Sequence, residues 1–172
     1  NRIHLEDNEL LFIFKEVLNR KDFTMQTKYR MSKGKSFKIH KFNKACSEDD
    51  NTIVFCKTKN GNVFGGFNHD PWDQMTEEST RNVIFSVTKQ TVHQFNPEND
   101  DSIPAFTYNS DLQLAFGYED LVIGDNCGLA ESCSSRMGQA CEFNKDGEET
   151  YLAGQPRFKL EEICILKCEF YD

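Results

Sequence analysis

The chain has 172 residues, a formal net charge of −8 and 28% charged residues. This length suits one domain spanning residues 1–172, and the 15 Phe supply large apolar groups for its core. The longest apolar runs, such as Leu10–Phe14, are too short to span a bilayer. No secretory signal is visible, and the chain opens on Asn1, so we expect a segment of a longer protein.

The charge is divided unevenly along the chain. Between Lys15 and Lys44 there are ten Lys/Arg against two acids, a local net of +8, whereas the other residues sum to −16. Such a division points to an anionic partner. The alternative is that the basic segment faces the acidic remainder of its own domain. The sequence leaves both interpretations open.

The N-terminal part, residues 1–46, is predicted to be helical and basic. Leu10, Ile13, Phe14, Val17 and Leu18 recur at helical spacing, and Asp7 or Asn8 is available as the cap. Alternating apolar residues over 23–31 predict a half-buried strand, which Gly34 ends. A short helix is predicted from Ser36 to Cys46, with Phe37, Phe42 and Ala45 pointing inward.

The β-rich part, residues 52–171, reads as short strands joined by turns. Thr52–Thr58 and Val63–Phe67 flank Asn60-Gly61, a strong hairpin signal, because both turn positions favour positive φ. Further strands are predicted over 82–87, 105–108, 112–116, 120–123 and 157–170. The expected fold class is α+β, mainly β: a two-sheet antiparallel β-sandwich flanked by a few short helices.

Gly65 and Gly66 follow Phe64 within a predicted strand, and Asn-His-Asp-Pro-Trp comes next. A phosphate-binding glycine loop would lie between a strand and a helix N-terminus. This context therefore excludes a nucleotide loop and predicts a bulge or a close backbone contact instead. Trp72 is expected to anchor the following loop on the core.

Four stretches in order resemble the TLDc domain of oxidation-resistance proteins, in the form found in protists. They are YRMSKGKSFKIHKFNKAC, TIVFCKTKNGNVFGGFNHDPW, LAFGYEDLVIGDNC and YLAGQPRFKLEEICIL. The resemblance implies a two-sheet sandwich and a protein-binding role in the oxidative-stress response, with the vacuolar proton pump as the candidate partner. The positions that match the family pattern and are expected to be structural are Asn60, Gly61, Phe64, Gly65, Gly66, Trp72, Gly117, Gly124, Gly154 and Glu162.

Three departures from the family pattern limit what the resemblance implies. Ser32-Lys33-Gly34-Lys35 lacks the usual acid, and a glycine cluster is reduced to Gly117. Cys164 stands where the family favours a carboxylate, which leaves Glu161 and Glu162 nearby. A pump contact that needs a carboxylate at position 164 is not supported by the sequence.

The first functional hypothesis is a non-catalytic interaction domain, because no signature of a catalytic nucleophile accompanies His69 or the cysteines. No cofactor, metal site or small-molecule substrate is expected. The candidate partner-binding residues form a basic face: Lys28, Arg30, Lys33, Lys35, Lys38, Lys41 and Lys44. An alternative is a stress-responsive regulator that binds DNA through this Lys28–Lys44 face.

The seven cysteines show no paired metal or disulfide spacing, which favours reduced thiols and a cytoplasmic or nuclear location. Cys127, Cys133 and Cys141 lie in or near a loop that is expected to be exposed, beside Arg136. A cysteine-based oxidant sensor using these three thiols is therefore a further alternative. Cys164 and Cys168 are expected to be buried and inert on one face of the last strand.

Overall fold

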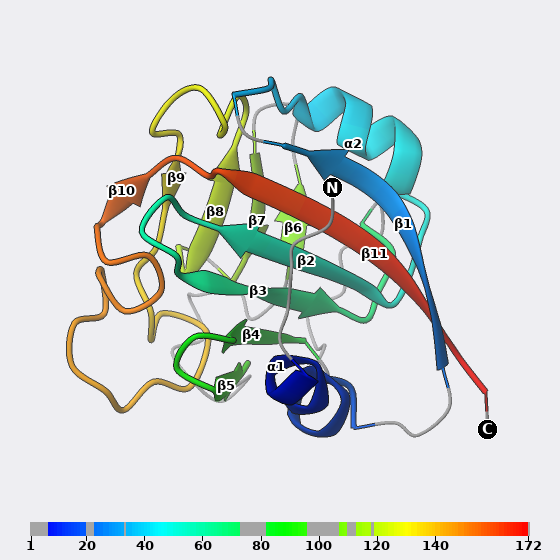
Figure 1. The fold of residues 1–172 in the computed structure, drawn as a ribbon, viewed down its shortest axis with the longest axis horizontal. Coiled ribbons are helices and arrows are strands. Elements are labelled where there is room, and N and C mark those ends of the chain that lie inside the picture. Colours follow the sequence, from blue (N-terminus) through cyan, green and yellow to red (C-terminus); the bar gives the residue numbers. More distant parts are fainter. Residues whose placement is uncertain are drawn as a thin grey trace.

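The computed structural model describes residues 7–19, 23–32, 34–72, 82–95, 107–109, 113–117 and 119–171. These residues form two antiparallel sheets and short helical segments (Figure 1). The helical segments are α1 (Asp7–Phe12), a π-helical turn η1 (Ile13–Leu18) and α2 (Ile39–Cys46). The predicted fold class, a mainly β sandwich with a few short helices, is confirmed.

The six-stranded sheet contains both the first and the last strand of the described chain. Its order is β1 (Phe23–Met31), β11 (Glu162–Phe170), β2 (Thr52–Lys57), β3 (Val63–Asn68), β4 (Val83–Ser86) and β5 (Thr91–Gln94). The five-stranded sheet has the order β10 (Arg157–Phe158), β9 (Cys133–Ser134), β8 (Leu121–Gly124), β7 (Gln113–Phe116) and β6 (Thr107–Asn109). The strands β5 and β9 were not predicted from the sequence, and the predicted last strand is divided into β10 and β11.

The centre of the six-stranded sheet is covered on both faces. Val54 and Cys56 of β2 belong to the core between the two sheets, with Phe116 of β7. Ile53 and Phe55 of the same strand belong to a second core, on the face that α1 and η1 cover. Because successive strand residues point to opposite faces, both faces of β2 must be apolar. This explains why β2 reads as a continuous apolar run and not as an alternating one.

The first helical segment has the predicted core contacts. Ile13, Val17 and Leu18 are buried in the second core, and the helix begins at Asp7. The side chains of Leu10 and Phe14 lie outside the described residues. The segment ends at Asn19, which adopts a left-handed conformation with φ of 50°.

The hairpin between β2 and β3 is confirmed, but its turn differs from the predicted one. Gly61 has φ of +89°, whereas Asn60 does not have a positive φ. Gly61 donates its N–H to Thr58 O, and Thr58 donates its own to Asn62 O. The connection is therefore longer than a two-residue turn, and a turn followed by one left-handed glycine closes it.

The glycine pair in β3 permits close packing without a bulge. Pairing of β3 with β2 and with β4 continues without a shift through Gly65 and Gly66. A Cβ atom on Gly66 would lie 2.4 Å from the ring of Phe116 in the opposite sheet, and one on Gly65 would lie 1.7 Å from Val54 O. Of the two predicted explanations, the close backbone contact is the correct one.

The alternation over 23–31 predicted one continuous apolar face on β1. The structure does not have such a face. The pairing of β1 with β11 shifts between Thr27 and Tyr29, which is a β-bulge. Phe23 therefore packs against the second core, whereas Tyr29 and Met31 belong with the core between the sheets. Met25, which was expected to lie on the buried face of this strand, is 37% exposed.

The helix α2 is shorter than predicted and is capped differently. It begins at Ile39 and not after Ser36, and Lys38 at its N-cap makes no side-chain capping bond. Ile39 N–H instead donates to Asp125 Oδ1 at 2.8 Å. Phe42 is buried as expected, but Ala45 is exposed. The helix is thus capped by Asp125, which is distant in sequence, and not by the predicted local cap Ser36.

Candidate basic interaction surface

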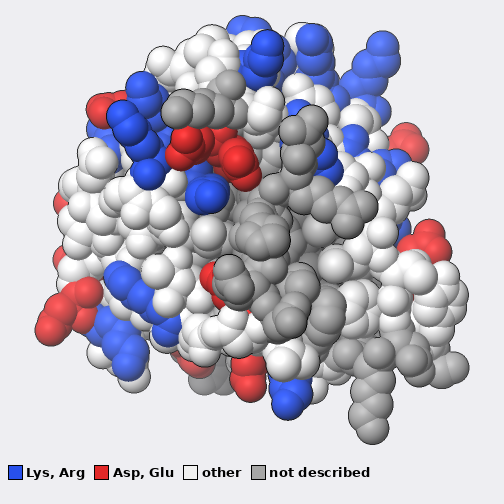
Figure 2. Space-filling view, in the orientation of Figure 1, with Lys and Arg blue, Asp and Glu red and all other residues white. Residues whose placement is uncertain are grey.

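The strand β1 and the helix α2 pack against each other and bring the predicted basic face together. Lys28 and Arg30 come from β1, Lys35 and Lys38 from the connection, and Lys41 and Lys44 from α2. Figure 2 shows Lys and Arg side chains gathered along the upper edge of the molecule, where α2 lies in Figure 1. Lys33 lies outside the described residues.

Two of these lysines are held by acids of the same domain. Lys28 Nζ lies 3.4 Å from Asp49 Oδ2, and Lys38 Nζ lies 3.5 Å from Asp125 Oδ2. Both pairs are partly exposed, so solvent and salt screen them. The interpretation that the basic segment faces its own acidic domain is thus correct for Lys28 and Lys38.

The remaining described cations of this face are exposed. Arg30, Lys35, Lys41 and Lys44 are open to solvent, and none forms an ion pair with another described residue. The turn that carries Asp125 lies beside α2, because Asn126 N–H donates to Phe37 O at 2.7 Å, and its Leu129 is 56% exposed. Free positive charge next to an exposed apolar side chain is a composition that suits a protein partner with acidic groups.

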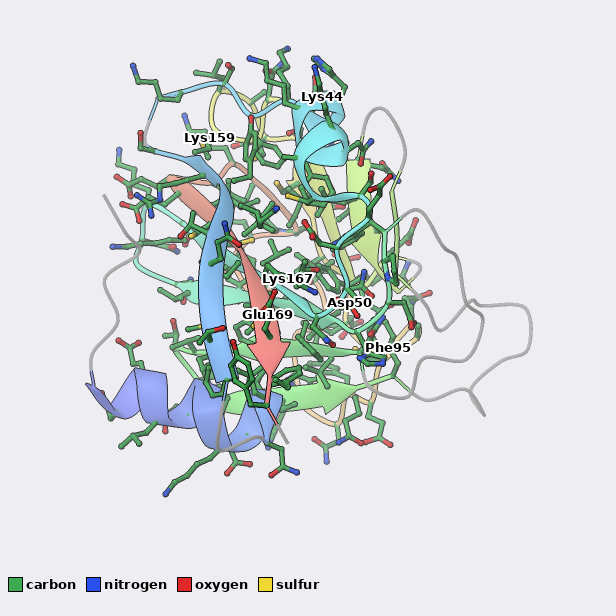
Figure 3. All side chains as sticks on the ribbon, turned by 90° about the vertical axis from the view of Figure 1, so that its right-hand side faces the viewer. Lys44, Asp50, Phe95, Lys159, Lys167 and Glu169 are labelled. Atoms are coloured by element: carbon green, nitrogen blue, oxygen red, sulfur yellow. The ribbon has the colours of Figure 1, made fainter. Side chains whose placement is uncertain are left out.

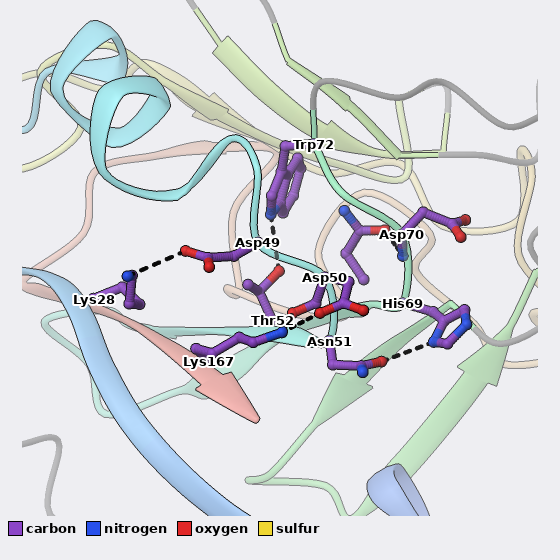
Figure 4. Close-up of polar contacts among 10 residues, drawn as sticks. Lys28, Asp49, Asp50, Asn51, Thr52, His69, Asp70, Trp72 and Lys167 are labelled. Atoms are coloured by element: carbon purple, nitrogen blue, oxygen red, sulfur yellow. Dashed lines mark hydrogen bonds and ion pairs between the residues drawn. The ribbon is translucent and has the colours of Figure 1, made fainter. Parts of the chain in front are cut away.

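A second polar cluster surrounds the loops that precede β2 and follow β3 (Figure 4). Lys167 donates to Asp50, and His69 Nδ1 lies 2.7 Å from Asn51 Oδ1. Trp72 Nε1 donates to Thr52 Oγ1 at 2.8 Å, and its indole is 2% exposed. The prediction that Trp72 anchors its loop is confirmed. The Lys167–Asp50 ion pair was not predicted, because its partners lie 117 positions apart in the sequence.

The expectation that the loop 127–141 exposes its cysteines is wrong. Cys127, Cys133 and Cys141 are at most 1% exposed, and all seven cysteines are free thiols. A hydrogen bond with Cys133 and burial raise the pKa of Cys127. Burial, followed by the charge of Asp120, raises the pKa of Cys141. Since the thiolate is the reactive form, this environment opposes the oxidant-sensor hypothesis.

Asp120 holds the loop 127–141 against the core. This role of Asp120 was not predicted from the sequence. Its buried carboxylate accepts N–H groups from Gln139, Ala140 and Cys141, and the thiol of Cys141 donates to Oδ2 at 3.1 Å. The only available signal was a lone Asp at the start of an apolar strand, which also suits an ordinary turn. Asp120 explains the burial of Cys141.

The other family-pattern positions support local packing. Gly117 has φ of +73°, and a Cβ there would lie 2.4 Å from Asp120 Oδ1, so glycine leaves room for that carboxylate. A Cβ on Gly124 would lie 2.2 Å from Ser132 O. Gly154 lies beside the hairpin, where Asn60 Nδ2 donates to Ala153 O. Phe64 is buried in the core between the sheets, and Glu162 is half-buried at the start of β11.

One cysteine and one histidine share a surface hollow, which Cys141 and His93 line together with Thr91 and Phe143. Each has other partners. His93 Nδ1 donates to the carbonyl of Glu142 at 3.1 Å, and Nε2 lies 3.0 Å from Thr91 Oγ1. Cys141 donates to Asp120. Neither ring nitrogen is left to act as a base toward the thiol.

A family model, described as the TLDc domain, matches residues 4–169. The chain belongs to the TLDc family. TLDc domains, as a family, are of the protein-interaction type and are associated with the oxidative-stress response. A search of curated proteins found no significant match. None of the helices in the described part of this TLDc domain has the length and apolar character needed to cross a membrane.

Proposed function

We propose that this TLDc domain is a non-catalytic module that binds an acidic protein partner through its basic face during the oxidative-stress response. The observation that carries the proposal is the exposure of Arg30, Lys35, Lys41 and Lys44 without an acidic partner among the described residues. In contrast, Asp49 and Asp125 partly neutralise Lys28 and Lys38. Complementary charge steers association and sets specificity.

The peripheral part of the vacuolar proton pump is the candidate partner, on the strength of the family resemblance. Cys164 occupies the position where the family favours a carboxylate, and its side chain is buried in the second core. A contact at this position is therefore not part of the proposal. The basic face supplies the proposed contact instead.

The burial of the thiols supports a non-catalytic role. Every described cysteine is buried, and His69 and His93 hold other hydrogen-bond partners. A nucleophile needs a base within hydrogen-bond reach and access to its substrate. None of the described thiols has His69 or His93 as such a base.

The test is affinity purification from cells, before and after peroxide treatment, with matched charge reversals. Lys41→Glu/Lys44→Glu should weaken partner binding about tenfold, since it removes two cations and adds two repulsive charges. Lys59→Glu/Lys159→Glu makes the same net change at exposed positions outside the basic face and should retain the partner.

The identity of the recovered material decides between the alternatives. Recovery of pump subunits that depends on Lys41 and Lys44 would support the proposal. Chromatin whose binding weakens as salt rises would favour the DNA-binding alternative, because phosphate contacts release counterions. Equal recovery with both double variants would contradict the role of the basic face.

A further inference from the structure

Among the described residues, the strand β1 is an outer strand of the six-stranded sheet and pairs only with β11. It lies on the side of the molecule that faces the viewer in Figure 3, with Lys44 of α2 above it. An edge strand directs half of its backbone N–H and C=O groups away from its neighbour. These groups are a template for pairing with another extended chain.

The register identifies which residues carry the outward groups. Cys168 N–H donates to Asn51 O, on the β2 side of β11, and Cys168 is paired with Met25. In a strand, the N–H and C=O of one residue point to the same side. Met25↔Cys168 is therefore a pair without mutual hydrogen bonds, and the backbone groups of Met25 point away from β11.

The backbone groups of Thr27, two residues further along the strand, also point away from β11, before the bulge shifts the register. Beyond the bulge, Arg30 is paired with Cys164, and its backbone groups again point away from β11. Among the described residues, Met25, Thr27 and Arg30 make no backbone hydrogen bond outside the β1–β11 pairing. We call the outward backbone of Met25 and Thr27 the free edge.

The side chains leave the free edge accessible. Thr24, Met25, Gln26 and Thr27 are all exposed, so both faces of this half of β1 are open. Native sheets protect their edges with charges, prolines or bulges. Here the bulge and the cations Lys28 and Arg30 lie in the second half of β1. The first half, FTMQT, has no such protection.

We infer that the free edge of β1 binds an extended acidic segment of a protein partner, which adds a strand to the sheet. The inference rests on the proposed function, because the cations of the basic face select the acidic partner. A segment paired with Met25 and Thr27 continues directly to Arg30, where a carboxylate would meet an exposed guanidinium. Main-chain hydrogen bonds supply affinity in strand addition, and side chains supply specificity.

A second copy of this chain is a poorer occupant. Pairing two β1 strands would bring two copies of Phe23–Met31 together, each with the cations Lys28 and Arg30 and no acid. Like charges across paired strands are destabilising. Charge complementarity therefore favours an acidic strand over self-association.

The experiment separates backbone pairing from side-chain contact at Met25. Met25→Pro removes an outward N–H without breaking a β1–β11 hydrogen bond, and proline is tolerated where the N–H faces solvent. Met25→Ala shortens the same side chain but keeps the N–H. The probe is a short, end-capped peptide of alternating Thr and Glu, and the matching Thr–Lys peptide is the charge control.

The Thr–Glu peptide should slow the hydrogen exchange of the Met25 and Thr27 amides in the wild-type chain, and the Thr–Lys peptide should not. Met25→Pro should bind the Thr–Glu peptide about tenfold more weakly than Met25→Ala, since main-chain pairing is lost. The exchange measurement on the wild-type chain does not depend on how well the proline variant folds.

Equal binding by the two variants, or unchanged exchange at Met25 and Thr27, would overturn strand addition. If the peptide then slowed hydrogen exchange only at amides near Lys41 and Lys44, the proposed function would stand but strand addition would not. A dimer that forms as concentration rises and is lost in Met25→Pro would also overturn the inference, because the occupant would be a second copy.

Discussion

At the scale of single residues, Asp120 shows how one carboxylate organises a loop without regular structure. Its oxygens accept three backbone N–H groups and one thiol, while Ser135 Oγ donates to its carbonyl at 2.7 Å. Burial raises the pKa of Asp120, and the bonds from Cys141, Ala140 and Gln139 lower it in part. These bonds hold the loop against β8, because a carboxylate is a stronger acceptor than a neutral group.

We expect Asp120→Asn to lower the free energy of unfolding by about 1–3 kcal/mol, because an amide nitrogen would then face buried donors. The folded-state pKa of Asp120 is raised, so the folded state binds this proton more tightly than the unfolded chain does. Its contribution to stability is greatest below the unfolded pKa and decreases as the pH rises through the folded pKa. The difference in the free energy of unfolding between wild type and Asp120→Asn should therefore become smaller as the pH rises above about 4.

Urea unfolding at a series of pH values measures this difference. Glu119→Gln is the matched control, since Glu119 is the exposed neighbour of Asp120. It should leave the free energy of unfolding nearly unchanged. A difference between wild type and Asp120→Asn that widens with rising pH would contradict the assignment.

At the scale of elements, the helix α2 depends on a residue from another part of the chain. Asp125, in the turn after β8, accepts the N–H of Ile39 and also pairs with Lys38. A carboxylate at a helix N-terminus satisfies an otherwise unpaired donor and interacts favourably with the helix dipole. The same contact joins α2, and with it the basic face, to the five-stranded sheet.

Asp125→Ala should lower the free energy of unfolding by about 0.5–2 kcal/mol, as for the loss of an N-cap. It should also speed hydrogen exchange in the first turn of α2. Lys38→Ala removes the ion pair but leaves the capping bond, and a partly exposed pair contributes only about 0–1 kcal/mol. Thermal unfolding and amide exchange compare the two variants. An equal loss in both would show that the ion pair matters and the cap does not.

At the scale of the whole molecule, the two cores shield every thiol. Burial, with a contribution from Asp49, raises the pKa of Cys46 to about 12, and burial raises that of Cys168 to about 12. Burial also raises the pKa of Cys56. Buried thiols of this kind react only when the structure opens.

We therefore expect the native domain to react with a thiol reagent or peroxide no faster than it opens, and to react fully in denaturant. The engineered variant Ala45→Cys supplies a control, because position 45 is exposed on α2 and its thiol should react at once. Mass spectrometry of the modified chain locates each reacting residue. Rapid modification of Cys127, Cys133 or Cys141 in the native state would restore the oxidant-sensor hypothesis.

Much of the fold could be predicted because local patterns agree with the tertiary structure. The strands β2 and β3 are mainly apolar and almost entirely buried, because both faces of the central sheet are covered, and Asn60-Gly61 between them marks the hairpin. The basic face was also visible, since its residues are neighbours in sequence. These features need only nearby residues to be recognised.

Other features depend on partners that no local pattern reveals. The cap of α2 comes from a residue 86 positions away, and the thiols of loop 127–141 are buried because Asp120 folds the loop onto the core. The free edge of β1 depends on pairing with β11 at the other end of the chain, and the bulge follows from that pairing. The sequence by itself determined most of the strands, the hairpin and the charge division, because each follows from nearby residues. Only the tertiary structure decided which cations stay unpaired, which thiols are shielded and which strand edge stays open, because long-range packing sets burial and pairing.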